Sequence, residues 1–405
     1  MSFAIKTDDL PENWLKKPLG ECATVQTGIA KGRRVDPDEA VFVPYLRVAN
    51  VQDGYLDLSE IRTIELRRSE VDRYLLRPGD VVLTEGGDLD KLGRGYVWSG
   101  EIPVCVHQNH VFAVRVDQSE LDPNFFSYQA QSSYGKGYFL SVAHKTTNLA
   151  CINTTKLKAF PVLIPPLHEQ KAISQILATV QRAIAAQERI IQSTTELKKA
   201  LMQKLFTEGL RGEPQKETEI GLVPESWEIV SFDKFVTLQR GFDLRKQDFR
   251  NGAVPVVGAT QVIGYHDTAN VKAPGVTVVR SGSSAGKPNF ISEDFWAHNV
   301  LLYVKDFQGN IPKFVYYKML ALNLAQYRQG VAVPTLNRNT LSAIKLALPS
   351  SSEQHEIADA LDAVVHRMEV AKLENFQNHD LFRTLLCELM SAKIRVCSIN
   401  LPVLQ

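Results

Sequence analysis

The chain has 405 residues, of which 44% are hydrophobic and 22% are charged, so it is expected to fold into two or three globular domains and not to be disordered. It contains no run of about 18 apolar residues, and its five cysteines are an odd number without a Cys-x-x-Cys pair, which excludes a membrane span and disfavours a disulfide framework. The sequence therefore predicts a cytoplasmic protein with free thiols. Because the formal net charge is only +1, any contact with nucleic-acid phosphates must be local.

Residues 1–165 are predicted to form a first globular domain of short strands separated by turn residues. Strands are expected at 42–48, at 81–83 after a Pro-Gly-Asp turn, and at 111–116. One helix is expected near 123–133, where a proline opens the segment.

A long helical region is predicted at 166–210, because residues 167–206 contain no glycine or proline. Its apolar residues recur at steps of three and four, which is typical of an amphipathic helix with a narrow seam. At about 1.5 Å per residue the helix would be roughly 60 Å long. The predicted packing positions are Ile173, Leu177, Val180, Ile184, Ile191, Leu197 and Leu201.

A linker at 211–221 is expected to lead into a second domain at 222–349. This domain repeats the order of the first, with strands at 254–257, 276–279 and 300–304 and a helix near 312–326.

A second long helical region is predicted at 350–397, followed by a tail at 398–405. Neither long helix can bury its stripe on one small domain, so the two stripes are expected to pack against each other. The packing positions predicted for the second helix are Ile357, Leu361, Val364, Met368, Leu381 and Leu385.

The sequence repeats itself over most of its length. Asn153 and Glu169 return as Asn337 and Glu353 at a constant offset of 184 residues (from 153 to 337). The motif Pro-Glu-x-Trp at 11–14 returns at 224–227, an offset of 213 (from 11 to 224). Such a long period indicates a domain duplication.

A duplicated unit whose long helices pair within one chain has an approximate two-fold axis only if the helices are antiparallel. The predicted fold is therefore α+β, with two globular domains at opposite ends of an antiparallel two-helix coiled-coil rod and an internal pseudo-two-fold repeat.

The sequence contains no recognisable catalytic or metal site. A methyltransferase would need a glycine-rich cofactor loop and an Asn/Asp-Pro-Pro-aromatic motif, and neither is present. The segment 282–288 differs from a nucleotide phosphate loop, because it has one residue too few between its glycines and Pro288 replaces the Ser or Thr. It is interpreted either as a turn that lays backbone N–H groups and Lys287 against a DNA phosphate or as a plain surface turn. Cys105, His107 and His110 lack a fourth ligand and would lie on different faces of a strand.

The loops of both domains are rich in side chains that can contact bases and phosphates. Arginine suits guanine, and asparagine or glutamine suits adenine, although a solvated surface side chain is the simpler interpretation for any single residue. The repeated Asn153 and Asn337 and the two Glu-Gln pairs are interpreted as architectural. The DNA-contact candidates are Thr27, Lys31, Arg33, Arg34, Arg47, Asn50, Lys91, Arg94, Lys145, Thr146, Asn148, Arg240, Arg245, Gln261, Arg280, Ser283, Ser284, Lys287, His298 and Arg338.

The whole chain resembles the specificity subunits (HsdS) of type I restriction-modification enzymes. The resemblance rests on the order domain, helix, domain, helix, on the motif Ile-Pro-Pro-Leu-His-Glu-Gln at 164–170, and on the two Pro-Glu-x-Trp motifs. Tyr-Phe-Leu at 138–140 and Lys-Thr-Thr-Asn at 145–148 also match. The chain departs from the pattern at 348–352, which lacks the second proline and the apolar residue after it.

The resemblance implies a non-catalytic DNA-binding subunit with two target-recognition domains. It would read a bipartite target in double-stranded DNA and bind two modification subunits, which methylate adenine, and through them two restriction subunits. S-adenosylmethionine, ATP and magnesium would belong to those partners. The alternatives are a structural adaptor with two protein-binding end domains and a methyltransferase or nuclease with a degenerate site.

Overall fold

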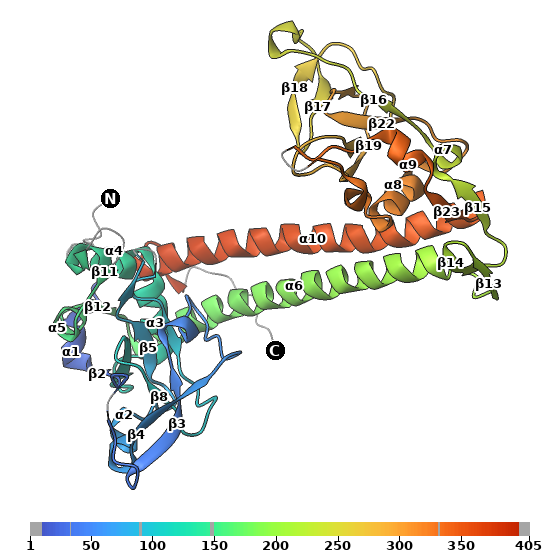
Figure 1. The fold of residues 1–405 in the computed structure, drawn as a ribbon. Helices are drawn as coiled ribbons and strands as arrows, with labels where there is room; N and C mark the ends of the chain where they lie inside the picture. The colour runs from blue at the N-terminus through green and yellow to red at the C-terminus, as the bar shows by residue number, and fades with distance from the viewer. Residues whose placement is uncertain (1–9, 33, 89–90, 146–149, 331–332, 397–405) are drawn as a thin grey trace. The chain divides into compact units, whose positions relative to one another are not determined.

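The computed structural model describes residues 10–32, 34–88, 91–145, 150–330 and 333–396. The chain divides into two compact units, which we call unit 1 (1–186 with 374–405) and unit 2 (187–373). Each unit combines antiparallel strands with helices (Figure 1). No helix within the described ranges is both long enough and apolar enough to cross a membrane.

The core of unit 1 is built around a four-stranded antiparallel sheet with the order β2-β9-β5-β7. Its strands are β2 (Ala23–Thr27), β9 (Val111–Val116), β5 (Val81–Thr84) and β7 (Gly95–Val97). Along β9, Phe112 and Val114 join one apolar cluster and Val111 and Ala113 join another, because successive side chains of a strand point to opposite faces. Both faces of this sheet are therefore covered.

A second sheet in unit 1 has the order β4-β3-β8, in which β3 and β8 are parallel. The helix predicted near 123–133 is present as α3 (Pro123–Gln131), and Ser132 ends it because its hydroxyl accepts the Gly135 N–H and caps the next helix. The remaining elements of unit 1, outside the long helices, are β4 (Arg62–Arg67), β3 (Ala40–Leu46), β8 (Val106–His107), β1 (Leu15–Pro18), β12 (Pro161–Ile164), β6 (Gly86–Gly87), β10 (His144–Lys145), β11 (Ala150–Cys151), α1 (Leu19–Cys22), α2 (Val71–Tyr74), α4 (Ser133–Val142), α5 (Thr154–Lys158) and the 3-10 turns Val48–Asn50 and Arg68–Glu70.

Unit 2 repeats this topology. Its main sheet has the order β16-β22-β19-β20, and its second sheet has the order β18-β17-β21, with β17 and β21 parallel. The strands of these two sheets are β16 (Thr237–Arg240), β22 (Leu301–Asp306), β19 (Gly275–Val279), β20 (Pro288–Ile291), β18 (Val262–His266), β17 (Val254–Val257) and β21 (Trp296–Ala297). The repeat found in the sequence thus corresponds to one strand order that occurs once in each unit.

Two segments of unit 2 differ from the sequence prediction. The helix expected at 312–326 ends early, as α8 (Pro312–Ala321), because Asn323 takes a left-handed conformation before the 3-10 turn Leu324–Tyr327. Part of the predicted linker 211–221 instead forms β13 (Gln215–Thr218), which pairs with β14 (Gly221–Pro224). The remaining elements are β15 (Glu228–Ser231), β23 (Lys345–Leu348), α7 (Phe232–Phe235), α9 (Arg338–Ser342) and the 3-10 turn Lys246–Asp248.

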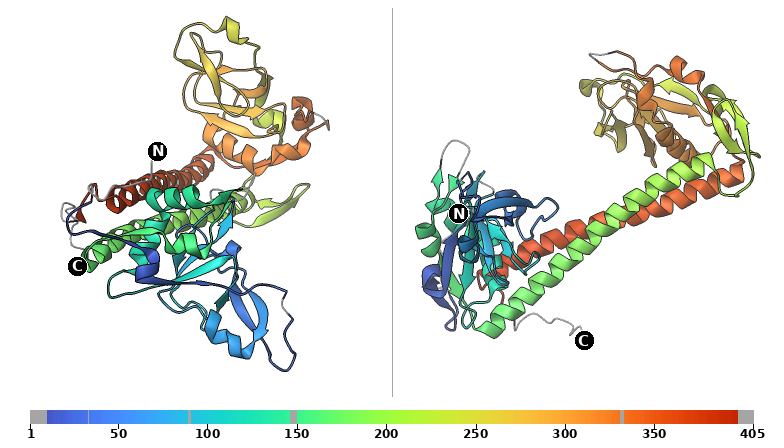
Figure 2. Two further views of the ribbon diagram at one scale, coloured as in Figure 1. Left: turned by 90° about the vertical axis from the view of Figure 1, so that its left-hand side faces the viewer. Right: turned by 60° about the horizontal axis from the view of Figure 1, so that its bottom comes forward.

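The two long helices are α6 (Leu167–Thr207) and α10 (Ser351–Met390), and each passes from one unit into the other. In unit 1, Ile173 and Leu177 of α6 share a core with Leu386 and Leu389 of α10. In unit 2, Leu205 of α6 and Leu361 of α10 join the second core in the same way. Within each unit the segments of α6 and α10 lie side by side (Figure 2).

Most of the predicted packing positions face inward, but Leu197 and Leu381 do not. Their side chains are 49% and 47% exposed, whereas the next residue in each helix, Lys198 and Phe382, is half-buried. Each residue rotates an α-helix by about 100°, so a position one residue away from the buried stripe points out of the core. The prediction that these two leucines pack between the helices is therefore wrong. The other predicted positions are either buried (Ile173, Leu177, Ile184, Ile357, Leu361 and Met368) or half-buried (Val180, Ile191, Leu201, Val364 and Leu385).

The repeated Glu-Gln pair connects the start of each long helix to its globular unit. The Gln170 amide oxygen accepts the Asp122 N–H (2.7 Å), and its nitrogen donates to the carbonyls of Glu120 and Pro165. Gln354 repeats this arrangement with the Ile311 N–H (3.0 Å) and with the side chain of Asn310. Both glutamines are buried and fully used, which supports the architectural interpretation of these residues.

The glutamates of the two pairs have different partners. Glu169 forms a two-pronged ion pair with Arg395 (2.8 and 2.9 Å). Glu353 accepts hydrogen bonds from the Leu210 N–H (2.8 Å) and from Nε1 of Trp227 (3.1 Å). Helix α10 begins at Ser351 although the second proline is missing there, and the Gln354 N–H bonds to the Ser350 carbonyl (2.9 Å).

Leu361→Ala and Leu197→Ala are a matched pair in unit 2 that tests the position of the buried stripe. Leu361 is fully buried, so its truncation is expected to cost about 2–5 kcal/mol of unfolding free energy. Leu197→Ala should change it by less than about 0.5 kcal/mol, because the side chain is half exposed. Urea unfolding followed by tryptophan fluorescence measures both, since Trp227 lies in the same core as Leu361. Equal losses for the two variants would contradict this placement.

Candidate DNA-binding surfaces

Three arginines converge on one depression of unit 2. Arg240 is the last residue of β16, Arg280 directly follows β19, and Arg338 begins α9. Strands β16 and β19 flank β22, so their ends meet at one edge of the sheet. The depression has a volume of about 830 Å³, and its lining also includes Asn299 and Asn337. The structure thus brings together three of the predicted DNA-contact residues.

The charge in this depression is largely uncompensated. The ion pairs of the described residues include none for Arg240, Arg280 or Arg338. Burial, followed by the nearby charge of Arg240, lowers the pKa of Arg280. The one carboxylate on the lining, Asp243, accepts a hydrogen bond from the Asn299 amide (2.8 Å). Such a site fits a hydrogen-bond acceptor with negative charge or partial charge, such as a phosphate or the guanine edge.

Unit 1 carries the opposite charge at the equivalent backbone position. The Arg280 N–H donates to Val300 (2.8 Å), and the Arg280 carbonyl accepts from Leu336 (2.7 Å). In unit 1 the same two bonds join Glu85 to His110 (2.9 Å) and to Ile152 (2.9 Å). The Glu85 carboxylate also lies 2.9 Å from Nδ1 of His110. Sequence reasoning did not select Glu85, because one unit has insertions relative to the other, and these change the residue offset between equivalent positions here.

Gly28 and Gly241, each two residues after a glutamine, lie tightly against a second backbone segment in their units. A Cβ atom on Gly28 would lie 2.0 Å from the His107 carbonyl oxygen, and one on Gly241 would lie 2.2 Å from the His298 carbonyl oxygen. Only glycine permits this close approach of two backbone segments. The polar run Gln108 to His110 and its counterpart His298 to Val300 are positioned by these contacts.

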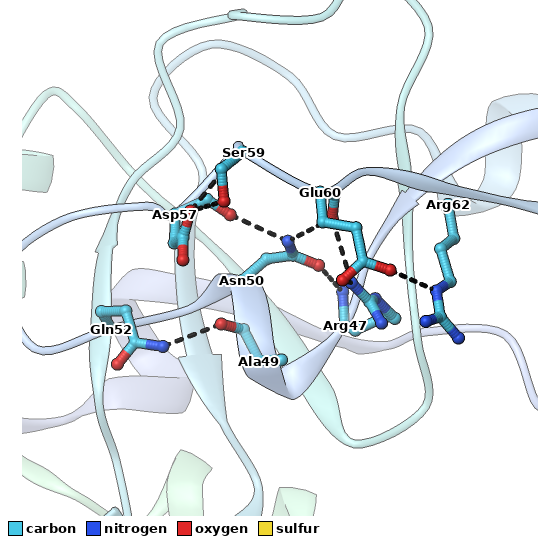
Figure 3. A network of polar contacts seen from close by, with 8 residues as sticks. All are labelled: Arg47, Ala49, Asn50, Gln52, Asp57, Ser59, Glu60 and Arg62. Atoms are coloured by element: carbon cyan, nitrogen blue, oxygen red, sulfur yellow. Dashed lines mark hydrogen bonds and ion pairs between the residues drawn. The ribbon is translucent and has the colours of Figure 1, made fainter. Parts of the chain in front are cut away.

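Two of the predicted DNA contacts, Asn50 and Arg47, take part in an internal polar network (Figure 3). Asn50 is only 3% exposed; its amide oxygen accepts the Arg47 N–H (2.9 Å), and its nitrogen donates to the carbonyls of Asp57 (2.8 Å) and Glu60 (3.1 Å). The Arg47 guanidinium donates to the Glu60 carbonyl (3.0 Å) and faces the Glu60 carboxylate (3.5 Å). The amide of Asn50 is thus used inside the fold and disagrees with its prediction as a DNA contact. Arg47 is half-buried with one terminal nitrogen bonded to Glu60, and its role as a DNA contact stays a prediction.

The remaining candidates of unit 1 are distributed over several loops. Thr27, Lys31, Arg34 and Lys145 are exposed, and the Lys31 ammonium lies over the ring of Tyr45. Two candidates are half-buried and engaged, since Lys91 pairs with Asp88 and Arg94 donates to the side chain of Gln52 (3.3 Å). Arg33, Thr146 and Asn148 lie outside the described residues.

The segment 282–288 forms the hairpin turn between β19 and β20. The backbone N–H groups of Ala285, Gly286 and Lys287 donate to carbonyls of Gly282, Val279 and Ser284. These three groups are therefore not free to cradle a phosphate, and the plain-turn interpretation holds for the backbone. The side chains of Ser283 and Lys287 are exposed, and Ser284 is half-buried.

The other candidates of unit 2 lie apart from the arginine cluster or at its margin. Both Nε and Nη2 of Arg245 donate to Asp248 (2.7 and 3.2 Å), so this arginine is already paired. Gln261 is exposed between β17 and β18. His298 is half-buried, and its Nε2 lies 3.8 Å from Asp243.

Cys105 and His107 belong to the core of unit 1. Burial raises the pKa of the Cys105 thiol to about 12 and lowers that of His107, whose Nδ1 lies 2.7 Å from the Val111 carbonyl oxygen. Across the described part of the chain, no three His, Cys, Asp or Glu side chains are close enough to hold a metal ion.

Comparison with known proteins assigns this duplicated architecture to a family. The model of the type I restriction modification DNA specificity domain matches residues 11–196 and 224–376. The chain therefore belongs to this family, whose function is the recognition of DNA sequence.

Known members resemble the chain over nearly all of its length or over about half of it. The putative type I restriction enzyme MjaX specificity subunit of Methanocaldococcus jannaschii is 24% identical, covering 96% of this chain and 95% of its own. The EcoKI specificity subunit of Escherichia coli K12 is 26% identical over 47% of this chain and 41% of its own. A crystal structure of a type I restriction-modification S subunit from M. genitalium has the same fold, with a TM-score of 0.61, 16% identity, and coverage of 94% of this chain and 98% of that one.

Asn50→Ala tests whether this residue is structural. The substitution leaves buried groups of Arg47, Asp57 and Glu60 without partners, which is expected to cost about 1–3 kcal/mol of unfolding free energy. The recognised DNA sequence should stay the same. Tyr55→Ala is the control, because Tyr55 is 57% exposed in the same loop region and its truncation should cost much less. Urea unfolding and sequencing of methylated DNA measure the two effects, and a changed target with unchanged stability would restore Asn50 as a DNA contact.

Proposed function

We propose that the two units each recognise one half of a bipartite target in double-stranded DNA. The observation that carries this proposal is one scaffold present twice with different side chains at equivalent edge positions, such as Glu85 and Arg280. Two identical scaffolds with identical edges would read the same half-site twice. Different edges specify two different half-sites, because base readout depends on the donors and acceptors that each edge presents.

The long helices would set the distance between the half-sites. Helix α6 has 41 residues and would be roughly 60 Å long at about 1.5 Å per residue. We propose that α6 and α10 pair as an antiparallel coiled coil with the two recognition units at its opposite ends. The packing of the first turns of α6 with the last turns of α10 in unit 1, and the reverse in unit 2, supports this arrangement. Successive major grooves recur about every 34 Å, so such a rod can reach separate grooves.

The chain would act as the non-catalytic subunit of a larger cytoplasmic complex, where its DNA target is available. We propose that two modification subunits bind it and that two restriction subunits join through the complex. S-adenosylmethionine, ATP and magnesium would then be bound by those partners. The net charge of +1 supports this division, because a complex that closes around the duplex can supply the phosphate contacts that this chain lacks.

Arg240→Ala and Arg338→Ala test the arginine depression as a DNA site. Each should weaken binding of the complex with the modification subunit to duplex DNA. If the lost contact is to a phosphate, the slope of log K against log salt should become shallower by about 0.9. Gel shifts at several salt concentrations measure affinity and slope. Lys272→Ala is the matched control, since Lys272 is exposed and paired with Asp294 (2.6 Å) away from the depression. Unaltered affinity and slope in both arginine variants would favour the structural adaptor.

A four-residue insertion tests the helices as a spacer. Four helical residues placed in α6 after Ala186 and in α10 after Leu373 add about 6 Å to each helix. The methylated target should then keep both half-site sequences and change only the spacing between them, as read by sequencing of methylated DNA. The same insertion in the turn between β13 and β14 is the control and should leave the spacing unchanged. Altered half-site sequences after the helical insertion would contradict the spacer role.

A further inference from the structure

We propose that Glu85 and Arg280, which occupy equivalent positions in the two units, each select one base of their own half-site. Arg280 would select a guanine, and Glu85 would select a base that offers an amino group in the major groove, cytosine or adenine. This inference rests on the proposed function and identifies the residue that gives each unit a different preference.

Backbone pairing shows that the positions of Glu85 and Arg280 are equivalent. Thr84 pairs with Val111 in unit 1 as Val279 pairs with Leu301 in unit 2, and the candidate residue is the next one along each strand. Its main-chain N–H and carbonyl are then held by the same two neighbouring segments in both units. Because the main chain makes these bonds, the side chain is free to differ without a change of scaffold.

Arg280 has a donor fork available for a ligand. Its Nε donates to the Asn299 carbonyl (3.3 Å), and no protein acceptor is found for its two terminal nitrogens in the described parts of unit 2. Burial and then the nearby charge of Arg240 lower the pKa of Arg280, so a bound acceptor would stabilise its charged form. The guanine edge presents two acceptors, O6 and N7, which an arginine can bind together.

Glu85 has the complementary chemistry. One carboxylate oxygen lies 2.9 Å from Nδ1 of His110, which fixes the orientation of the carboxylate. The other oxygen, Oε1, has no hydrogen-bond partner among the described residues. The Glu85 side chain is 25% exposed, so a ligand can reach it. A carboxylate accepts hydrogen bonds only, so it matches the N4 amino group of cytosine or the N6 amino group of adenine.

The sign of the charge separates a base contact from a phosphate contact. An arginine alone would suit either ligand. A position that served the DNA backbone would keep a positive or neutral side chain in both units, since a carboxylate repels phosphate. The presence of Glu85 where unit 2 has Arg280 therefore points to the base edges.

The reciprocal substitutions Arg280→Glu and Glu85→Arg test the inference in the complex reconstituted with modification subunits. The readout is methylation of a duplex library randomised across the target, scored at each position. Arg280→Glu should replace guanine by cytosine or adenine at one position of one half-site. Glu85→Arg should introduce guanine at one position of the other half-site. Discrimination at the affected position is expected to change by roughly 5- to 150-fold, the range for one bidentate contact.

Alanine variants at the same two positions are the second arm, in case a charge reversal prevents folding. Each should relax the preference at a single position and leave the other half-site intact. The charge-neutralising controls Lys272→Gln in unit 2 and Glu39→Gln in unit 1 remove exposed, paired charges from surfaces not assigned to DNA and should change no position.

Two results would overturn the inference while leaving the proposed function in place. One is uniformly weaker methylation with the same preferred target, which would make Arg280 a phosphate contact. The other is a change in both half-sites from a single substitution. If the wild-type complex itself methylated the library without sequence preference, the proposed function would fail together with the inference.

Discussion

The burial of one apolar stripe on each long helix is the constraint on which the rest of the protein depends. The cores of both units contain turns from both helices, with Ile173 and Leu389 in unit 1 and Leu205 and Ile357 in unit 2. Neither core is complete without residues that are far apart in the chain. The globular units consequently cannot be described apart from the helices, and the repeat of the sequence has to preserve the stripe in both halves.

The start of each long helix shows how this constraint reaches the recognition scaffold. Gln170 and Gln354 hold the main chain just ahead of α3 and α8, so helix and scaffold share buried hydrogen bonds. Buried amides of this kind are costly to leave unpaired, which explains why the Glu-Gln pair recurs unchanged. By contrast, Glu85 and Arg280 place no such demand on the scaffold, because their main-chain bonds do not depend on side-chain identity. Positions such as Gln170 and Gln354 therefore maintain the architecture, while Glu85 and Arg280 can vary and set the specificity.

Local charge matters more here than the total. The chain as a whole carries +1, yet Arg240, Arg280 and Arg338 share one depression without ion-pair partners in the described residues. At physiological salt, charges interact over about 8 Å, so such a cluster acts on a nearby ligand regardless of the distant carboxylates. Weak overall attraction combined with a strong local site favours selection between sequences over non-specific binding to any duplex.

The sequence alone determined the duplication, the two long helices, the main strands of each unit and the family. These features depend on hydrophobic periodicity and on the order of motifs along the chain, both of which can be read from the sequence. Tertiary structure decided the rest. Asn50 has the right chemistry for DNA, but the return of the chain at Asp57 and Glu60 uses its amide group inside the fold. Leu197 and Leu381 obey the helical spacing, but a rotation of one residue moves them off the buried stripe. Arg240, Arg280 and Arg338 are separated along the chain, and Glu85 matches Arg280 only through strand pairing, so their placement follows from the sheet and not from local sequence.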